Sequence, residues 1–168
     1  MCAINGFNFK DDHLLKKMSS MTYSRGPDNE GFFSSNKFSL AHNRLAIIDP
    51  TPKSNQPYYY EELVLSFNGE IYNYKDLRKK LESRGHNFLT NSDTEVVIRL
   101  FKEYGINSFK LLTGIFSIAI YDKQKDTLYL SRDIVGVKPL YYHFDTLKKN
   151  FFFSSLIKSL LLLSLIHI

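Results

Sequence analysis

The stretch "MCAI" (residues 1–4) places Cys2, the only cysteine of the 168-residue chain, directly after the first methionine. A lone cysteine is often a small buried hydrophobe, and the apolar residues around it are typical of a first core strand. Cysteine is also small enough for an aminopeptidase to remove Met1, which would leave a free α-amine beside the thiol. An amine with a pKa of about 7.7 to 8.0 can take the proton of a thiol with a pKa of about 8.5 during attack. Two interpretations follow, a core residue or a nucleophile that carries its own base.

The composition indicates one ordered globular domain, because 43% of the residues are hydrophobic and 15% are aromatic, without repeats or low-complexity tracts. The net charge of +5 is not gathered into one basic patch. The lysines and arginines within residues 77–85 lie on a predicted helix, beside Glu82, and those within residues 146–150 lie in a predicted turn. Such residues are typical of solvated faces, so we expect no nucleic-acid partner.

The last thirteen residues, 156–168, are apolar but contain Lys158. A membrane-spanning helix needs about 20 apolar residues, so we expect no membrane span. One cysteine excludes an internal disulfide, and no charged segment followed by an apolar segment begins the chain. The expected location is the cytoplasm.

Strand and helix patterns arrive in blocks, which favours an α+β layered fold over a doubly wound parallel sheet. The segments 38–49 and 62–70 are predicted as neighbouring antiparallel strands. Asn73 is a candidate cap for one helix, and Ser92 with Glu95 is a candidate capping box for the next. The predicted strands are 2–9, 38–49, 62–70, 115–122, 127–133, 139–144 and 150–155, and the predicted helices are 11–23, 74–84 and 94–104. No P-loop, zinc-ligand spacing or dinucleotide fingerprint occurs, so no metal and no cofactor is expected in this chain.

The dipeptide Asn68–Gly69 offers a side-chain amide and a backbone N–H close together, as the oxyanion of a tetrahedral intermediate requires. The alternative is an ordinary hairpin turn, in which Asn-Gly is common.

Three charged residues could hold the two ends of a free amino acid. Arg44, within an apolar strand pattern, could clamp a carboxylate or pair with Asp49. Asp93 could bind an ammonium group or cap a helix, and Glu70 could face the same ammonium or contribute only surface charge. Together with a nucleophile and oxyanion donors, these groups describe a site for glutamine.

With these motifs the chain resembles the N-terminal glutaminase domain of glutamine-dependent asparagine synthetases, a class II glutamine amidotransferase of the N-terminal nucleophile hydrolase fold. The matching segments follow the order and spacing of that family from Met1 to about Ser155. They are "MCAI" (1–4), "RGPDNEG" (25–31), "HNRLAIID" (42–49), "NQPY" (55–58), "FNGEIYN" (67–73), "SDTEV" (92–96), "GIFSIAIYD" (114–122) and "RDIVGVKPLYY" (132–142).

The resemblance implies a four-layer αββα sandwich of antiparallel sheets, with Cys2 as nucleophile and its own amine as base. It implies that Asn68 and Gly69 form the oxyanion hole and that Asp93 with Glu70 binds the α-ammonium of glutamine. Arg44 would bind the α-carboxylate, and the loop at residues 25–28 would lie near the site. The pocket wall would comprise Arg44, Leu45, Ala46, Ile47 and Ile48.

The chain departs from the family at three positions. Ala3 and Ser24 stand where the family usually has glycine and histidine, and Leu156 stands where an acidic residue is typical. We expect residues 1–155 to form the amidotransferase domain and residues 156–168 to be a truncated or non-native tail. The C-terminal synthetase domain, which would need ATP and magnesium, is absent from this sequence. A homodimer is a further expectation.

Two alternative functions stay open. The first is a non-catalytic module that binds glutamine or a protein partner. The presence of five residues argues against it: Cys2, Asn68, Gly69, Arg44 and Asp93. The second is an N-terminal cysteine hydrolase of another amide, which would leave Arg44 and Asp93 without a purpose.

Overall fold

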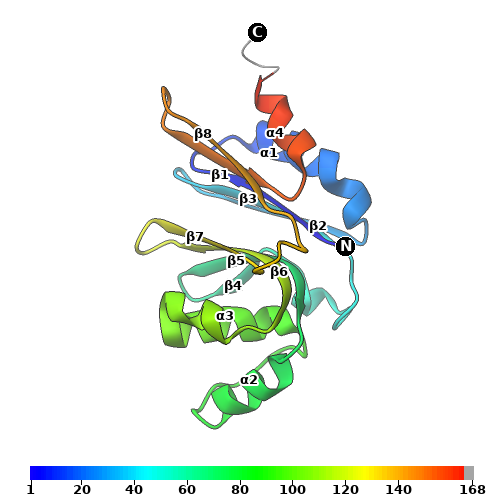
Figure 1. The fold of residues 1–168 in the computed structure, drawn as a ribbon, viewed down its shortest axis with the longest axis vertical. Helices are drawn as coiled ribbons and strands as arrows, with labels where there is room; N and C mark the ends of the chain where they lie inside the picture. The colour runs from blue at the N-terminus through cyan, green and yellow to red at the C-terminus, as the bar shows by residue number, and fades with distance from the viewer. Residues whose placement is uncertain (165–168) are drawn as a thin grey trace.

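The computed structural model describes residues 1–164, and within them two antiparallel sheets pack face to face between two layers of helices (Figure 1). We call the sheet that contains β1 (Ala3–Phe7) the β1 sheet, and the sheet that contains β5 (Leu63–Ile71) the β5 sheet. Helices α1 (Asp12–Thr22) and α4 (Ile157–Ser164) cover the outer face of the β1 sheet. Helix α3 (Asp93–Tyr104) covers the outer face of the β5 sheet, and α2 (Tyr74–Glu82) packs against α3 (Figure 1). The predicted four-layer αββα sandwich is therefore confirmed.

The β1 sheet has the strand order β2-β3-β1-β9-β8, and the β5 sheet has the order β4-β5-β6-β7. The strands are β1 Ala3–Phe7, β2 Asn29–Ser34, β3 Ser39–Arg44, β4 Tyr58–Tyr60, β5 Leu63–Ile71, β6 Gly114–Asp122, β7 Thr127–Arg132, β8 Tyr141–Asp145 and β9 Asn150–Ser154. The α-helices are α1 Asp12–Thr22, α2 Tyr74–Glu82, α3 Asp93–Tyr104 and α4 Ile157–Ser164, and the 3₁₀ turns are η1 Tyr23–Arg25, η2 Pro52–Ser54 and η3 Gly105–Leu111.

The core of the described residues comprises three clusters of apolar side chains. Ile4 of β1 packs between the two sheets, with Val64 of β5 and Phe153 of β9. A second cluster, which includes Phe67 and Ile98, fills the space between the β5 sheet and its helices. Because side chains alternate along a strand, the residues of β5 next to Phe67 face the opposite way, toward the β1 sheet. This alternation directs Asn68 into the space between the sheets.

One sequence prediction about strand pairing is wrong. The segments 38–49 and 62–70 do not pair, because β3 lies between β1 and β2 whereas β5 lies between β4 and β6. The two strands instead face each other across the sandwich, where His42 Nε2 and the Phe67 carbonyl oxygen are 3.0 Å apart. Nearly every residue of β3 and β5 is buried, so their apolar patterns do not reveal which strand is the neighbour.

Helix α4 occupies part of the predicted tail. Ser159 donates a hydrogen bond of 3.3 Å to the Met18 carbonyl, which joins α4 to α1. The last four tail residues, 165–168, lie outside the described residues, and the boundary at residue 155 stays a prediction. No helix within residues 1–164 is both long and apolar enough to cross a bilayer.

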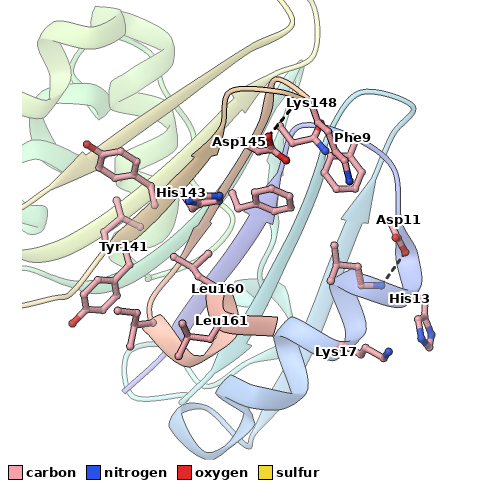
Figure 2. A pocket seen from close by; sticks show the side chains of 16 residues that line it. Phe9, Asp11, His13, Lys17, Tyr141, His143, Asp145, Lys148, Leu160 and Leu161 are labelled. Carbon is pink, nitrogen blue, oxygen red and sulfur yellow. Dashed lines mark hydrogen bonds between the residues drawn. The ribbon is translucent and has the colours of Figure 1, made fainter. Parts of the chain in front are cut away.

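A large cavity of about 770 Å³ opens between α1, β8 and α4 (Figure 2). Its wall includes Phe9, His143 and Leu160, which Figure 2 labels. None of the site residues predicted from the sequence lines this cavity. The size of a cavity therefore does not locate the predicted chemistry in this fold.

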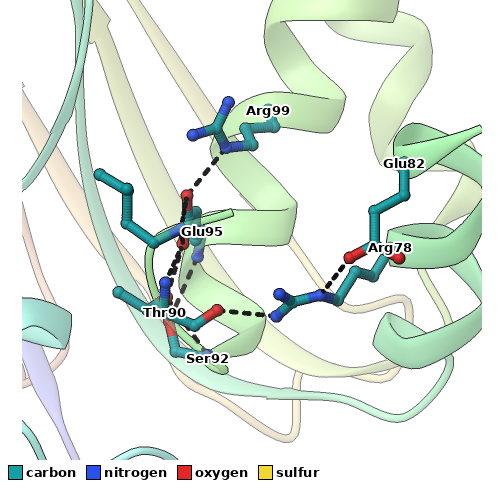
Figure 3. Close-up of polar contacts among 7 residues, drawn as sticks. Arg78, Glu82, Thr90, Ser92, Glu95 and Arg99 are labelled. Carbon is teal, nitrogen blue, oxygen red and sulfur yellow. Dashed lines mark hydrogen bonds and ion pairs between the residues drawn. The ribbon is translucent and has the colours of Figure 1, made fainter. Parts of the chain in front are cut away.

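The start of α3 is fixed by hydrogen bonds that surround Glu95 (Figure 3). Ser92 Oγ accepts a hydrogen bond of 3.3 Å from the N–H of Glu95, as the capping-box pattern predicts. The Glu95 carboxylate does not complete the box at Ser92. It accepts the N–H groups of Leu89 and Thr90 at 3.0 and 2.7 Å and forms an ion pair with Arg99 at 2.9 Å. These contacts hold the first turn of α3, which carries Asp93, against the preceding loop.

Candidate active site

Cys2 lies immediately before β1, where its thiol meets the first residue after β3. The thiol accepts the N–H of Leu45 at 3.4 Å and lies 3.6 Å from the Leu45 carbonyl oxygen. Arg25 Nε donates to the Cys2 carbonyl at 3.1 Å, which fixes the backbone of the same residue. Burial raises the pKa of the Cys2 thiol, and the Leu45 N–H, the terminal ammonium and Arg44 only partly oppose this effect. The thiol is therefore mostly protonated at neutral pH and needs a base to become a nucleophile.

A cavity of about 100 Å³ opens beside the Cys2 thiol. Residues that lie far apart in the sequence share its wall, because the ends of β1, β3 and β5 and the first turn of α3 meet there. Among the predicted residues, the wall includes Cys2, Arg44, Leu45, Ile47, Ile48, Asn68, Gly69, Glu70 and Asp93. Ala46 is the exception, since it does not line the cavity and its N–H donates to Asp28 Oδ2 at 2.8 Å.

Asn68 and Gly69 lie inside strand β5, opposite Ser117 and Phe116 of β6, so the hairpin-turn interpretation is wrong. The Asn68 side chain is buried, and its Nδ2 has no hydrogen-bond partner among the described residues. Buried amide groups are nearly always paired, so an unpaired donor in a cavity wall is a place where a ligand oxygen would bind.

Gly69 is required at its position by the close approach of β6. A Cβ at residue 69 would lie 2.2 Å from the Ile115 carbonyl oxygen, which no side chain tolerates. The N–H of Phe67 donates to Gln56 rather than to β6. Because backbone groups two residues apart in a strand have the same direction, the Gly69 N–H also turns away from β6, at a position that lines the cavity. The two predicted oxyanion donors, the Asn68 amide and the Gly69 N–H, therefore lie next to each other in the cavity wall.

The guanidinium group of Arg44 is held by oxygen atoms of the loop that follows β3. Nη1 donates to the Thr51 carbonyl at 3.0 Å and to Asn55 Oδ1 at 2.7 Å, and Nη2 contacts the Asp49 carbonyl. The Asp49 carboxylate instead accepts the N–H of Asn91 at 2.7 Å, so the alternative interpretation of Arg44 as an ion-pair partner of Asp49 is wrong. Neutral oxygens fix the orientation of the guanidinium but leave its charge for an anion in the cavity.

The carboxylate of Asp93 is buried in the cavity wall, and its Oδ2 accepts the N–H of Ile71 at 3.1 Å. Burial, with a smaller contribution from the nearby Glu70, raises the pKa of this carboxyl to about 6, against the opposing effect of the N–H groups of Ile71 and Thr94. The helix cap itself is Ser92, so capping does not account for Asp93. Two acidic side chains at one cavity provide a place for a cation.

Several residues of the cavity wall are not among the site residues predicted from the sequence. These are Gln56, Phe67, Thr94 and Lys138, together with Met1. Gln56 belongs to the "NQPY" segment, and that match is the only sequence pattern that marks it. Within residues 1–164, no group of three or more His, Cys, Asp or Glu side chains is arranged to hold a metal ion.

Curated relatives show what this chain is similar to. Asparagine synthetase [glutamine-hydrolyzing] 1 of Bacillus subtilis is 40% identical over 152 residues, which cover 89% of this chain and 24% of the relative. Asparagine synthetase B [glutamine-hydrolyzing] of Escherichia coli is 40% identical over 153 residues, covering 86% of this chain and 27% of the relative. The chain thus spans about a quarter of the length of these relatives.

A solved structure, the glutamine phosphoribosylpyrophosphate amidotransferase of B. subtilis, superposes with a TM-score of 0.77 at 21% identity. The superposition covers 94% of this chain and 42% of that chain, and it shows the shared sandwich fold. The sequence family described as the glutamine amidotransferase domain matches residues 1–167, which is nearly the whole chain. By this match, with the fold and the cavity beside Cys2 in agreement, the chain belongs to the glutamine amidotransferase domain family.

Proposed function

We propose that this domain hydrolyses glutamine to glutamate and ammonia, with Cys2 as the nucleophile. The observation that carries the proposal is the buried Asn68 Nδ2, which has no hydrogen-bond partner within the described part of the chain and lines the same cavity as the Cys2 thiol. An oxyanion formed at a substrate carbonyl next to the thiol would supply the missing acceptor. The names of the curated relatives, which specify glutamine hydrolysis, agree with this substrate.

Glutamine would bind through the two charged groups of its backbone end. Its α-carboxylate would face the Arg44 guanidinium, which loop oxygens already hold in place. Its α-ammonium would face Asp93 and Glu70 at the other side of the cavity. Because both ends are fixed, the side-chain carboxamide would be directed to the thiol, with Leu45 and Ile48 as apolar wall.

The reaction requires removal of Met1, so that the α-amine of Cys2 becomes the base. The amine takes the thiol proton as the sulfur attacks the carboxamide carbon, and Asn68 with Gly69 binds the negative oxygen. The protonated amine then donates its proton to the leaving nitrogen, which departs as ammonia and leaves a γ-glutamyl thioester. Water, deprotonated by the same amine, attacks the thioester and releases glutamate and the thiol.

Beyond this half-reaction, the relatives suggest the fate of the ammonia. They are named asparagine synthetases and are about four times as long as the matched region. We propose that the complete protein carries a synthetase domain that uses ATP and magnesium to amidate aspartate with this ammonia. A cytoplasmic location, favoured by the single cysteine, and a homodimer are further proposals.

The test is glutamate release from glutamine by the protein with Met1 removed, compared with Cys2→Ala. We expect release by the first protein and none by the variant, which should still bind glutamine in calorimetric titration. Glutamine binding without glutamate release by the unaltered protein would favour the non-catalytic module. Equal release by both proteins would remove Cys2 from the mechanism.

A further inference from the structure

The side chain of Gln56 pairs with the backbone of Phe67 as a neighbouring strand would. Its Oε1 accepts the N–H of Phe67 at 2.6 Å, and its Nε2 donates to the carbonyl of Phe67 at 3.2 Å. Strand β4 pairs with β5 only as far as Tyr58 opposite Leu65. Gln56 therefore continues the pairing past the end of β4 with a buried carboxamide.

His42 holds the same carbonyl from the β1 sheet. Its Nε2 lies 3.0 Å from the Phe67 oxygen and must carry the hydrogen, because a carbonyl only accepts. Burial lowers the pKa of His42 to about 3, so the ring is neutral at physiological pH. Thr94 Oγ1 accepts a hydrogen bond from Gln56 Nε2 at 3.4 Å, which orients the carboxamide from the side of α3. His42 of β3 and Gln56 of the loop before β4 therefore contact the same Phe67 carbonyl, and Thr94 of α3 orients Gln56.

The peptide group between Phe67 and Asn68 leads directly into the predicted oxyanion hole. The Phe67 carbonyl and the Asn68 N–H belong to one planar unit, so fixing the carbonyl also fixes the direction in which the chain continues to Asn68 and Gly69. We propose that Gln56 is a positioning residue that sets the orientation of the two oxyanion donors. This inference rests on the proposed function and gives a positioning role to Gln56, a residue of the cavity wall whose carboxamide is hydrogen-bonded to Phe67 and Thr94.

The test compares two carboxamides that make the same kind of contact. Asn8 accepts the N–H of Phe151 at 2.7 Å and donates to the Lys149 carbonyl at 3.0 Å, beyond the far end of β1 from Cys2. Gln56→Met and Asn8→Leu each keep the size of the side chain and remove both hydrogen bonds. The readouts are kcat for glutamine, the affinity of glutamine in a Cys2→Ala background, and inhibition by the aldehyde analogue of glutamine, whose adduct with Cys2 places an oxygen in the oxyanion hole.

We expect Gln56→Met to lower kcat by about 10- to 100-fold and to weaken the aldehyde inhibitor by a similar factor. Glutamine affinity in the Cys2→Ala background should change less than about twofold, and Asn8→Leu should leave all three readouts unchanged. Should Gln56→Met not fold, Gln56→Asn decides by the same readouts, because its carboxamide is one methylene too short to reach both groups of Phe67.

Three outcomes would count against the inference. Equal kcat in the Gln56 and Asn8 variants would overturn it, and so would a loss of glutamine affinity as large as the loss of kcat, since that indicates a general disturbance of the pocket. An unaltered protein that releases no glutamate would overturn the proposed function and the inference with it. That last outcome is separate, because it is seen before any variant is compared.

Discussion

The carboxylate of Asp93, in the first turn of α3, accepts a 3.1 Å hydrogen bond from the backbone N–H of Ile71, the last residue of β5. This contact joins the predicted ammonium site to the strand that carries Asn68 and Gly69. Burial of the Asp93 carboxyl raises its pKa to about 6. The charge of this site therefore changes within an accessible range of pH.

We predict that glutamine binds more weakly as the pH falls below about 6. The α-ammonium favours the ionised carboxylate, so protonation of Asp93 removes its partner. The dissociation constant, measured by calorimetric titration with Cys2→Ala protein, should rise about tenfold for each pH unit below the pKa of Asp93. In Asp93→Asn the affinity should be low at every pH, and a variant that retained the full pH dependence would remove Asp93 from the ammonium site.

The same carboxyl should lower stability as the pH rises. Its pKa in the folded protein, about 6, lies above the value of about 3.9 in an unfolded chain, so the folded state binds more protons between these values. The free energy of unfolding should fall as pH rises through this window, by about 2 to 3 kcal/mol for this group. Urea unfolding of the unaltered protein and Asp93→Asn at pH 4 and pH 7 gives the difference. Identical pH dependence in both proteins would contradict the prediction.

The position of Cys2 and the chemistry of Asn68, Gly69, Arg44 and Asp93 could be predicted because each is encoded locally. A cysteine after the first methionine or an Asn-Gly pair in an apolar run is visible in a few letters. The structure brings these residues to one cavity, while their roles in catalysis stay predictions. Ala46 shows the limit of this approach, because a run of pocket residues does not reveal which member turns away.

Strand pairing and the supporting contacts could not be predicted, because they depend on residues distant in sequence. The alternation that distinguishes a half-exposed strand is absent from β3 and β5, which are buried on both faces. Strand β4 has three residues, too few for a periodic pattern. The carboxamide of Gln56 meets Phe67 only after the chain has folded back on itself, and no local pattern marks that contact.

We predict that Arg44→Lys weakens glutamine binding although it keeps the charge. Lysine cannot present two parallel N–H groups to a carboxylate, and it also cannot hold the loop oxygens of Thr51 and Asn55 together. The expected loss is about 1.5 to 3 kcal/mol, or roughly 10- to 150-fold in affinity. Arg84→Lys, which alters an exposed ion pair with Glu103 outside the cavity, is the matched control. Unchanged affinity in Arg44→Lys would exclude Arg44 from carboxylate binding.

Asn68→Ala should lower turnover by about 10²- to 10³-fold with a smaller effect on glutamine affinity. The loss of Nδ2 should change the free energy of unfolding little, because this atom has no hydrogen-bond partner among the described residues. Steady-state kinetics and thermal melting measure the two effects separately. Near-normal turnover would show that another group stabilises the oxyanion, whereas a large loss of stability would show that the side chain is structural.

The strongest test of the mechanism is an N-terminal extension that cannot be removed. It converts the basic α-amine of Cys2 into an amide without useful basicity, while the thiol stays intact beside Leu45. Burial raises the pKa of that thiol, so the thiol does not ionise readily without a base. We predict that the extended protein melts as the unaltered one does but releases no glutamate, and that proteolytic exposure of Cys2 restores turnover. Intact mass of the active protein should show the loss of Met1. Full activity in the blocked protein would contradict the mechanism, because Cys2 would then need a base other than its own amine.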